Sequence, residues 1–233
     1  PASLEDFCAG LLSRLCQLVD RTIFGPYTSN VRYTRLFTRT IRDIPSEVRS
    51  RSYQFLLRAG YVRSLGSGLY SYLPLGWRVV QRIQEIIEEE LAPLGAQQIH
   101  VPLVNPYELW KKSRRSLLVN EDMIRFSDRF GRELVLAPTH EEAVVELVRS
   151  SLSSYRELPV FVYQFQTKFR DEERVRFGLV RTREFIMKDA YSFHVSFSDL
   201  NNFLPKVFNA YERIFRRCGV EVVAAEAGVG YMG

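Results

Sequence analysis

The feature that most constrains the fold is a pair of apolar segments that flank a charged loop in the second half of the chain. The first segment runs from Val160 to Phe165 and leads into Phe-Arg-Asp-Glu at 169–172. A charged loop with one glycine follows at 173–179, and a second segment covers 180–187. Two strand-like segments around a polar loop predict an antiparallel β-hairpin.

The charged residues of this hairpin suit a nucleotide. Arg170 and Glu172 are two apart on one expected strand, and Arg181 and Phe185 are four apart on its partner, so each pair lies on one face. Arginine makes bidentate contacts to phosphate and carboxylate, and an aromatic ring stacks on a base. We therefore predict a site for a nucleoside triphosphate. The alternative is a surface hairpin whose charges are solvated or pair with one another, with Phe185 in the core.

The remaining sequence predicts an α+β fold, with a mainly antiparallel sheet and flanking helices. Helical periodicity and end signals predict helices from about 45 to 59, from 77 to 91, after Asn105-Pro106, from 143 to 152, and from about 198 to 218 with Pro205 inside. Because of that proline we expect a kink in the last helix or a late start near Lys206. Expected strands cover 61–65 and 69–73, 97–101, 123–126 and 133–136, and 220–225.

Residues 1–30 contain an amphipathic helix pattern that ends at Gly25-Pro26, and we interpret them as an appendage of unknown role.

Composition narrows the function classes only modestly. The formal net charge of +5 fits a polyanionic partner without requiring one. Cys8, Cys16 and Cys218 form neither a metal-binding spacing nor a disulfide framework, which favours a reducing, intracellular setting. No apolar run approaches the roughly 18 residues that a membrane span needs, so we expect no membrane insertion.

A second candidate site lies at Thr139-His140-Glu141-Glu142. Thr139 with Glu142 three residues later predicts a capping box at the start of a helix. The capping box leaves Glu141 unexplained, and its carboxylate is suited to hold an ammonium group. A zinc site is not expected, because position 144 is Val and the HExxH pattern is absent.

Longer stretches resemble a known family. Phe-Arg-x-Glu at 169–172 followed by Arg-x-x-x-Phe at 181–185 resembles motif 2 of class II aminoacyl-tRNA synthetases, here about 165–189. The helix from Trp77 and the strand that ends at Pro102 resemble motif 1, about 77–104. The sequences at 57–76, 137–142, 166–172 and 176–194 narrow the resemblance to bacterial-type prolyl-tRNA synthetase, over about 31–233.

The resemblance implies roles for individual residues. Arg170 would contact the α-phosphate of ATP and the carboxylate of proline, Arg181 the outer phosphates, and Phe185 the adenine ring. Glu172 would contact an adenine edge or the 3′ end of tRNA. The family's Thr-x-Glu, which reads the imino group of proline, matches Thr139 and Glu141, and Pro102 would lie at a homodimer interface.

The implied reaction joins proline to tRNA(Pro). Proline attacks ATP, with Mg²⁺ on the phosphates, and the prolyl group of the adenylate then passes to the 3′-terminal ribose of the tRNA. Arg170 and Arg181 would act by charge stabilisation. The resemblance implies a cytoplasmic location, with an organellar one as the alternative.

The chain also departs from the family. Residues 31–233 match a partial class II catalytic domain that ends before motif 3, the Gly-x-Gly-x-x-Arg helix, and before the anticodon-binding domain. We therefore expect the chain alone to have little or no activity. The alternatives are a non-catalytic class II-like module for binding or dimerisation, or a sister synthetase for threonine, serine or glycine.

Overall fold

The computed structural model describes residues 32–119 and 122–226, so the helix expected within 1–30 lies outside the described residues. The described chain divides into two units. The first comprises 32–90, 174–182 and 210–222, and the second comprises 91–119, 122–173, 183–209 and 223–226. Within these ranges, the helices are too short or too polar to cross a membrane.

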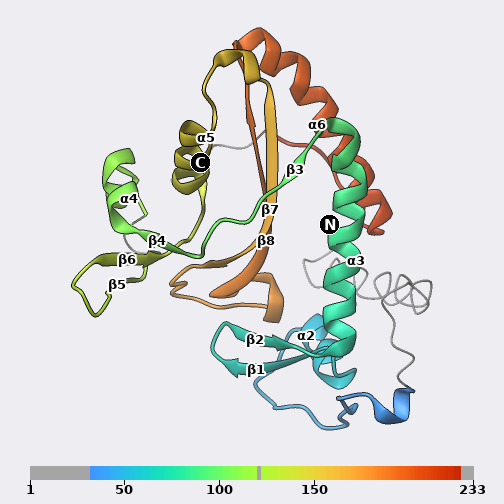
Figure 1. The fold of residues 1–233 in the computed structure, drawn as a ribbon. Coiled ribbons are helices and arrows are strands. Elements are labelled where there is room, and N and C mark those ends of the chain that lie inside the picture. Colours follow the sequence, from blue (N-terminus) through green and yellow to red (C-terminus); the bar gives the residue numbers. More distant parts are fainter. Residues whose placement is uncertain (1–31, 120–121, 227–233) are drawn as a thin grey trace. The chain divides into compact units, whose positions relative to one another are not determined.

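The second unit is built on the predicted hairpin. β7 (Val160–Phe169) and β8 (Glu184–Phe193) pair antiparallel along their whole length (Figure 1), from Val160↔Phe193 to Phe169↔Glu184. β3 (Gln97–Gln98) adds a short parallel strand to the outer side of β7, which confirms only the start of the strand expected at 97–101. Successive side chains of a strand point to opposite faces, so β7 presents two different surfaces.

The two faces of β7 have different partners within this unit. On one face, Phe161 packs edge-to-face on Phe203 of α6 (Phe197–Arg217), with ring centroids 5.1 Å apart. On the other face, Val162 packs with Val144 of α5 (Glu141–Ser151). That second face also carries the polar residues Gln164, Gln166 and Lys168 further along the strand.

The expected placement of the charged hairpin residues is wrong. Arg170 and Glu172 follow the end of β7, and Arg181 precedes β8, so none of the three lies on a strand of the hairpin. Phe177 and Gly178 adopt positive φ angles of 56° and 64°, which turn the chain into η5 (Gly178–Val180). This turn closes an isolated antiparallel bridge between Arg176 and Arg181 in the first unit, so β8 begins four residues later than predicted.

A smaller sheet completes the second unit. β4 (Val104–Pro106) and β5 (Arg125–Ser127) both pair antiparallel with β6 (Glu133–Leu136), which confirms the second predicted hairpin. α4 (Tyr107–Ser113) also confirms its prediction, and η3 (Arg115–Leu117) follows it. Trp110 is fully buried in an apolar core. The other members of this core are Tyr107, Val119, Met123, Val135 and Ala137. η2 (Ala92–Leu94) and η4 (Tyr155–Glu157) lie in connections of this unit.

In the first unit a small hairpin lies between two helices. α2 (Arg51–Arg58) is followed by Gly60 with a φ of 70°, as expected of a C-terminal stop. β1 (Val62–Gly66) and β2 (Leu69–Tyr72) form the predicted hairpin, and α3 (Pro74–Leu91) follows. α2 begins later than expected because Pro45 starts a turn, with the Val48 N–H donating to its carbonyl at 3.1 Å. η1 (Tyr33–Arg35) precedes these elements.

The end of α6 packs on α3 in the first unit. Ile86 of α3 contacts Ile214 and Cys218 in one apolar cluster. Glu90, near the unfavourable negative end of α3, receives hydrogen bonds from Arg213 and Arg217, which lower its pKa. These ion pairs offset the unfavourable position of the Glu90 carboxylate near the negative end of α3.

Two outcomes in the C-terminal part differ from expectation. α6 runs from Phe197 to Arg217, so the late start near Lys206 is wrong, whereas the alternative, a kink at Pro205, stays a prediction. Pro205 is accommodated inside the helix, where it leaves one backbone carbonyl without its usual N–H donor. The strand expected at 220–225 is absent, and those residues have no regular structure.

Candidate functional site

The site is centred on the turn that joins β6 to α5. α5 begins at Glu141 with His140 as its N-cap residue, and no side chain caps the helix. The capping box predicted for Thr139 and Glu142 is therefore wrong. The Thr139 hydroxyl donates instead to the Glu141 carboxylate, and Thr139 itself is buried.

Arg115 explains why Glu142 is not available as a capping group. Its Nη1 lies 3.0 Å from Glu141 Oε2 and 3.1 Å from Glu142 Oε1. The Ser113 hydroxyl donates to the same Glu142 oxygen at 3.0 Å. Burial opposes the charge of Arg115, but its hydrogen bonds to the two carboxylates outweigh burial and raise the pKa of its guanidinium.

The two carboxylates of this cluster differ in access to solvent. The Glu142 side chain is 4% exposed and the Glu141 side chain is 43% exposed. Two carboxylates face one guanidinium, so the group of three carries one excess negative charge. Glu141 is therefore the acid that can receive a cation from solvent.

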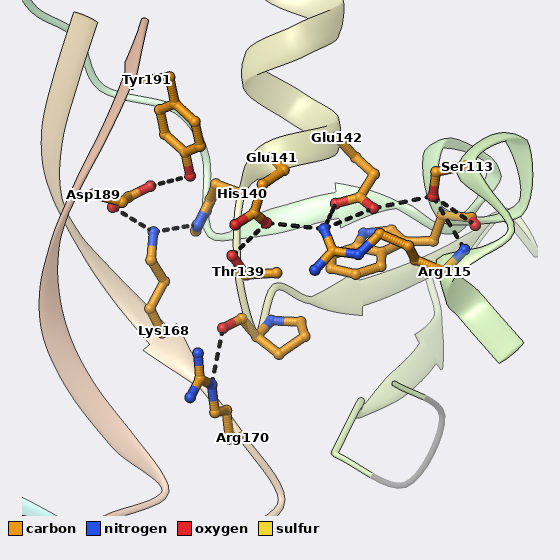
Figure 2. A network of polar contacts seen from close by, with 12 residues as sticks. Ser113, Arg115, Thr139, His140, Glu141, Glu142, Lys168, Arg170, Asp189 and Tyr191 are labelled. Atoms are coloured by element: carbon orange, nitrogen blue, oxygen red, sulfur yellow. Dashed lines mark hydrogen bonds and ion pairs between the residues drawn. The ribbon is translucent and has the colours of Figure 1, made fainter. Parts of the chain in front are cut away.

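Behind the turn, His140 is tied to the hairpin by a buried lysine (Figure 2). Lys168 Nζ lies 2.5 Å from His140 Nδ1 and 2.8 Å from Asp189 Oδ1. On the other side of the ring, His140 Nε2 lies 3.1 Å from the Pro102 carbonyl oxygen. A carbonyl can only accept, so the ring proton is on Nε2, and Nδ1 accepts from the ammonium group.

The protonation of His140 follows from these surroundings. Burial lowers its pKa to about 4, and the neighbouring Lys168 charge acts in the same direction. Burial also lowers the pKa of Lys168, an effect that Asp189 opposes. The imidazole is therefore neutral near pH 7, as an acceptor for the ammonium group must be.

Asp189 is anchored by two further side chains. Its Oδ2 accepts from the Tyr191 hydroxyl at 2.5 Å and from Gln164 Nε2 at 3.0 Å. Gln164 in turn accepts from the Val101 N–H at 3.0 Å. Burial and the contact with Asp189 raise the pKa of Tyr191, so its phenol stays protonated as a donor.

Arg170 lies beside the same turn. Its Nε donates to the Pro138 carbonyl at 3.1 Å, and its guanidinium carbon lies 5.3 Å from the centroid of the Phe185 ring. The second unit thus brings Thr139, Glu141, Arg170 and Phe185 together around one turn.

The other predicted site residues are placed differently. Arg181 is exposed and belongs to the first unit. Glu172 lies in the loop after β7, where its carbonyl accepts from Arg183 Nε at 3.3 Å. Pro102 is exposed, and its carbonyl also accepts from Asn105 Nδ2 at 2.7 Å. Its assignment to a dimer interface stays a prediction.

Several site residues were not predicted from the sequence, namely Arg115, Gln164, Lys168, Asp189 and Tyr191. The alternation of Gln164, Gln166 and Lys168 in an otherwise apolar strand is a signal that one face of β7 is polar. No comparable local signal marks Arg115, which is 26 residues from Glu141.

Comparisons with known proteins find similar sequences and structures. Residues 124–231 match the model of the tRNA synthetase class II core domain (G, H, P, S and T). The chain is 52% identical to a proline–tRNA ligase of Synechococcus sp. (strain CC9605), over 87% of the chain and 35% of that protein. It is 47% identical to the proline–tRNA ligase of Caldicellulosiruptor bescii, over 87% of the chain and 36% of that protein.

A solved structure agrees with these relatives. The Giardia lamblia prolyl-tRNA synthetase in complex with prolyl-adenylate matches with a TM-score of 0.62 and 26% identity, over 67% of the chain and 33% of that protein. The chain thus spans about a third of the length of the proteins it matches.

Proposed function

Because the chain belongs to the class II aminoacyl-tRNA synthetases, as a relative of proline–tRNA ligase, we propose that it carries the proline-activating part of such a ligase. In this proposal the complete enzyme joins proline to ATP, giving prolyl-adenylate and pyrophosphate, and then transfers the prolyl group to tRNA(Pro). The observation that supports it most directly is the half-exposed Glu141 carboxylate beside Thr139 and Arg170 in one unit.

The charges of the turn suit a zwitterionic amino acid. The ring ammonium of proline would neutralise the excess negative charge of the Glu141, Glu142 and Arg115 cluster. The carboxylate of proline would meet the guanidinium of Arg170, which can bind it in a bidentate manner. We propose Thr139 and Glu141 as the groups that bind the imino nitrogen.

The proposed ATP contacts start from the same arginine. Arg170 would stabilise the charge that develops on the α-phosphate as the proline carboxylate attacks. Phe185, which lies against Arg170, would stack on the adenine ring, and Glu172 would contact an adenine edge or the tRNA 3′ end. The assignment of Arg181 to the outer phosphates stays a prediction.

Mg²⁺ would enter with ATP in this proposal. In the described part of the chain no three His, Cys, Asp or Glu side chains gather as a metal cage. Magnesium is commonly bound through substrate phosphates and few protein ligands, so the residues present fit an ion carried by ATP. When bound, it would offset the negative charge of the phosphates.

Titration calorimetry of the chain with L-proline tests the proposal. Glu141→Gln removes the charge that holds the ammonium, and a hydrogen bond between charged groups contributes about 1.5–3 kcal/mol, so we expect affinity to fall roughly 10- to 150-fold. Glu146→Gln is the matched control, because Glu146 is an exposed acid on the same helix, paired with Arg149. It should bind proline as the wild type does.

A panel of amino acids separates the alternatives. Binding of threonine, serine or glycine in preference to proline would indicate a sister synthetase. Absence of binding to any amino acid would favour a non-catalytic module. Arg170→Ala should abolish adenylate formation by a complete enzyme and would leave the partner binding of a non-catalytic module intact.

Assembly and location are proposed on the family resemblance alone. We propose a homodimer with Pro102 at its interface and a cytoplasmic enzyme. Light scattering of the wild type and of Pro102→Arg, which would place a charge at the interface, tests the dimer.

A further inference from the structure

The Thr139–Glu141 turn has a second, buried side that the proposed substrate contacts do not use. Thr139 and Glu141 bond to each other on the accessible side, and His140 between them points into the interior, where it is fully buried. Its ring bridges the Pro102 carbonyl and the Lys168 ammonium, and Figure 2 shows the contact with Lys168. The ring therefore links the turn to β7 and to the segment before β4.

The burial of the Lys168 ammonium group at this position is energetically unfavourable. Its side chain is 0% exposed, and that of Asp189 is 11% exposed. Removing two charges from water costs several kcal/mol for each ion, and an apolar pair of similar volume often stabilises a fold as well or better. Stability alone therefore does not explain the pair, whereas orientation of a neighbouring group does.

The geometry specifies what the pair orients. An ammonium group can only donate, so it fixes His140 Nδ1 as an acceptor and leaves Nε2 to donate to Pro102. Asp189 holds the ammonium in place and is itself held by Tyr191 and Gln164. Rotation of the ring would break two hydrogen bonds of buried groups, so the main chain of residue 140 has little freedom.

We propose that Lys168, with Asp189 as its counter-ion, is a positioning residue for amino-acid recognition that acts through His140. It holds the turn so that Thr139 and Glu141 face the substrate together. The inference rests on the proposed function for its substrate, but its structural part concerns the turn itself and can be tested without proline.

The test uses three variants of the whole chain. Lys168→Met removes the donor and leaves the Asp189 charge buried. Because that variant can fail to fold, the double variant Lys168→Met/Asp189→Asn removes both charges and keeps an amide for Tyr191 and Gln164. Phe161→Leu is the control, because Phe161 packs on the opposite face of β7.

The first readout is nuclear magnetic resonance without ligand. In the wild type we expect the His140 ring in its Nε2–H tautomer. In the double variant we expect displaced amide signals for Thr139 and Glu141, whereas Phe161→Leu leaves both in place. Unchanged signals of these two amides in the folded double variant would overturn the proposal.

The second readout is the dissociation constant for proline. We expect it to rise at least tenfold in the double variant and to change less than twofold in Phe161→Leu, even where the control lowers stability. Wild-type affinity in the double variant would also overturn the proposal. If the wild type itself binds no proline, the proposed function fails, and the amide signals alone decide the role of Lys168.

Discussion

The contact of Arg115 with two acids gives a prediction whose size follows from burial. Glu142 is 4% exposed and Arg115 is 17% exposed, so Arg115→Met leaves a buried carboxylate whose remaining partner is the Ser113 hydroxyl. Breaking a fully buried ion pair costs about 3–5 kcal/mol. Because Arg115 is partly accessible and Ser113 remains, we expect a loss of about 2–3 kcal/mol in the free energy of unfolding.

The double variant Arg115→Met/Glu142→Gln separates charge from packing. It replaces the unpaired carboxylate with a neutral amide that can still accept from Ser113. We expect it to recover most of the loss, so the two substitutions should couple by about 1.5 kcal/mol in a double-mutant cycle.

Urea denaturation followed by tryptophan fluorescence measures both variants. Trp110 is fully buried in the core of the second unit, and the Arg115 guanidinium lies 5.7 Å from its ring centroid. All variants also carry Trp77→Phe, which removes the tryptophan fluorescence of the first unit. Arg149→Met, which breaks an exposed pair on α5, is the control and should leave the denaturation midpoint nearly unchanged.

Two outcomes would refute the reasoning about this cluster. One is an Arg115→Met variant that is no less stable than the Arg149→Met control. The other is a double variant that is as unstable as Arg115→Met alone, because the loss would then come from packing rather than from an uncompensated charge.

Two further predictions concern pH and packing. The pKa of His140 falls from 6.5 in the unfolded chain to about 4 in the fold, so its stabilising contribution is complete above pH 6.5 and is lost as pH falls towards 4. Between pH 6.5 and 5 we expect the free energy of unfolding to fall by about 1–2 kcal/mol, a loss that is absent from His140→Asn and is measured by urea denaturation. Equal slopes of stability against pH for both proteins would contradict this. Gly76→Ala would place a Cβ 2.2 Å from the Tyr61 carbonyl oxygen in the first unit, whereas at Gly66 the nearest atom lies 3.6 Å away. We expect Gly76→Ala to lower the melting temperature clearly and Gly66→Ala to lower it much less, and equal shifts in calorimetry would count against the packing argument.

Local sequence signals predicted most of the elements and fewer of the contacts. Apolar segments and turn residues located the β7–β8 hairpin, and helical periodicity located α3. These signals were sufficient because each depends on residues that are close together in the sequence. The start of β8 was missed by four residues, since the positive φ angles at Phe177 and Gly178 lengthen the connection. In the β7–β8 register Lys168 faces Phe185 and Asp189 faces Gln164, so the ion pair of Lys168 with Asp189 joins residues that are not cross-strand partners and was not predictable from spacing.

The capping box shows why local signals misplace a site residue. Thr139 and Glu142 have the required spacing, and the prediction assumed that neither had a better partner. Arg115 and Ser113 take the Glu142 carboxylate from 27 and 29 residues away. The exposed acid, Glu141, was singled out because the helix start left it without a local explanation, and its role as a ligand for an ammonium group stays a prediction.

The neutral sum of charges at 140, 168 and 189 has a consequence for how this chain can vary. The charge that each of the three side chains can carry depends on the charges of the other two, because an unpaired buried ion is strongly destabilising. We therefore expect relatives of this chain to substitute residues 168 and 189 together. A substitution at only one of the two positions should be tolerated only in a chain whose free energy of unfolding is otherwise high.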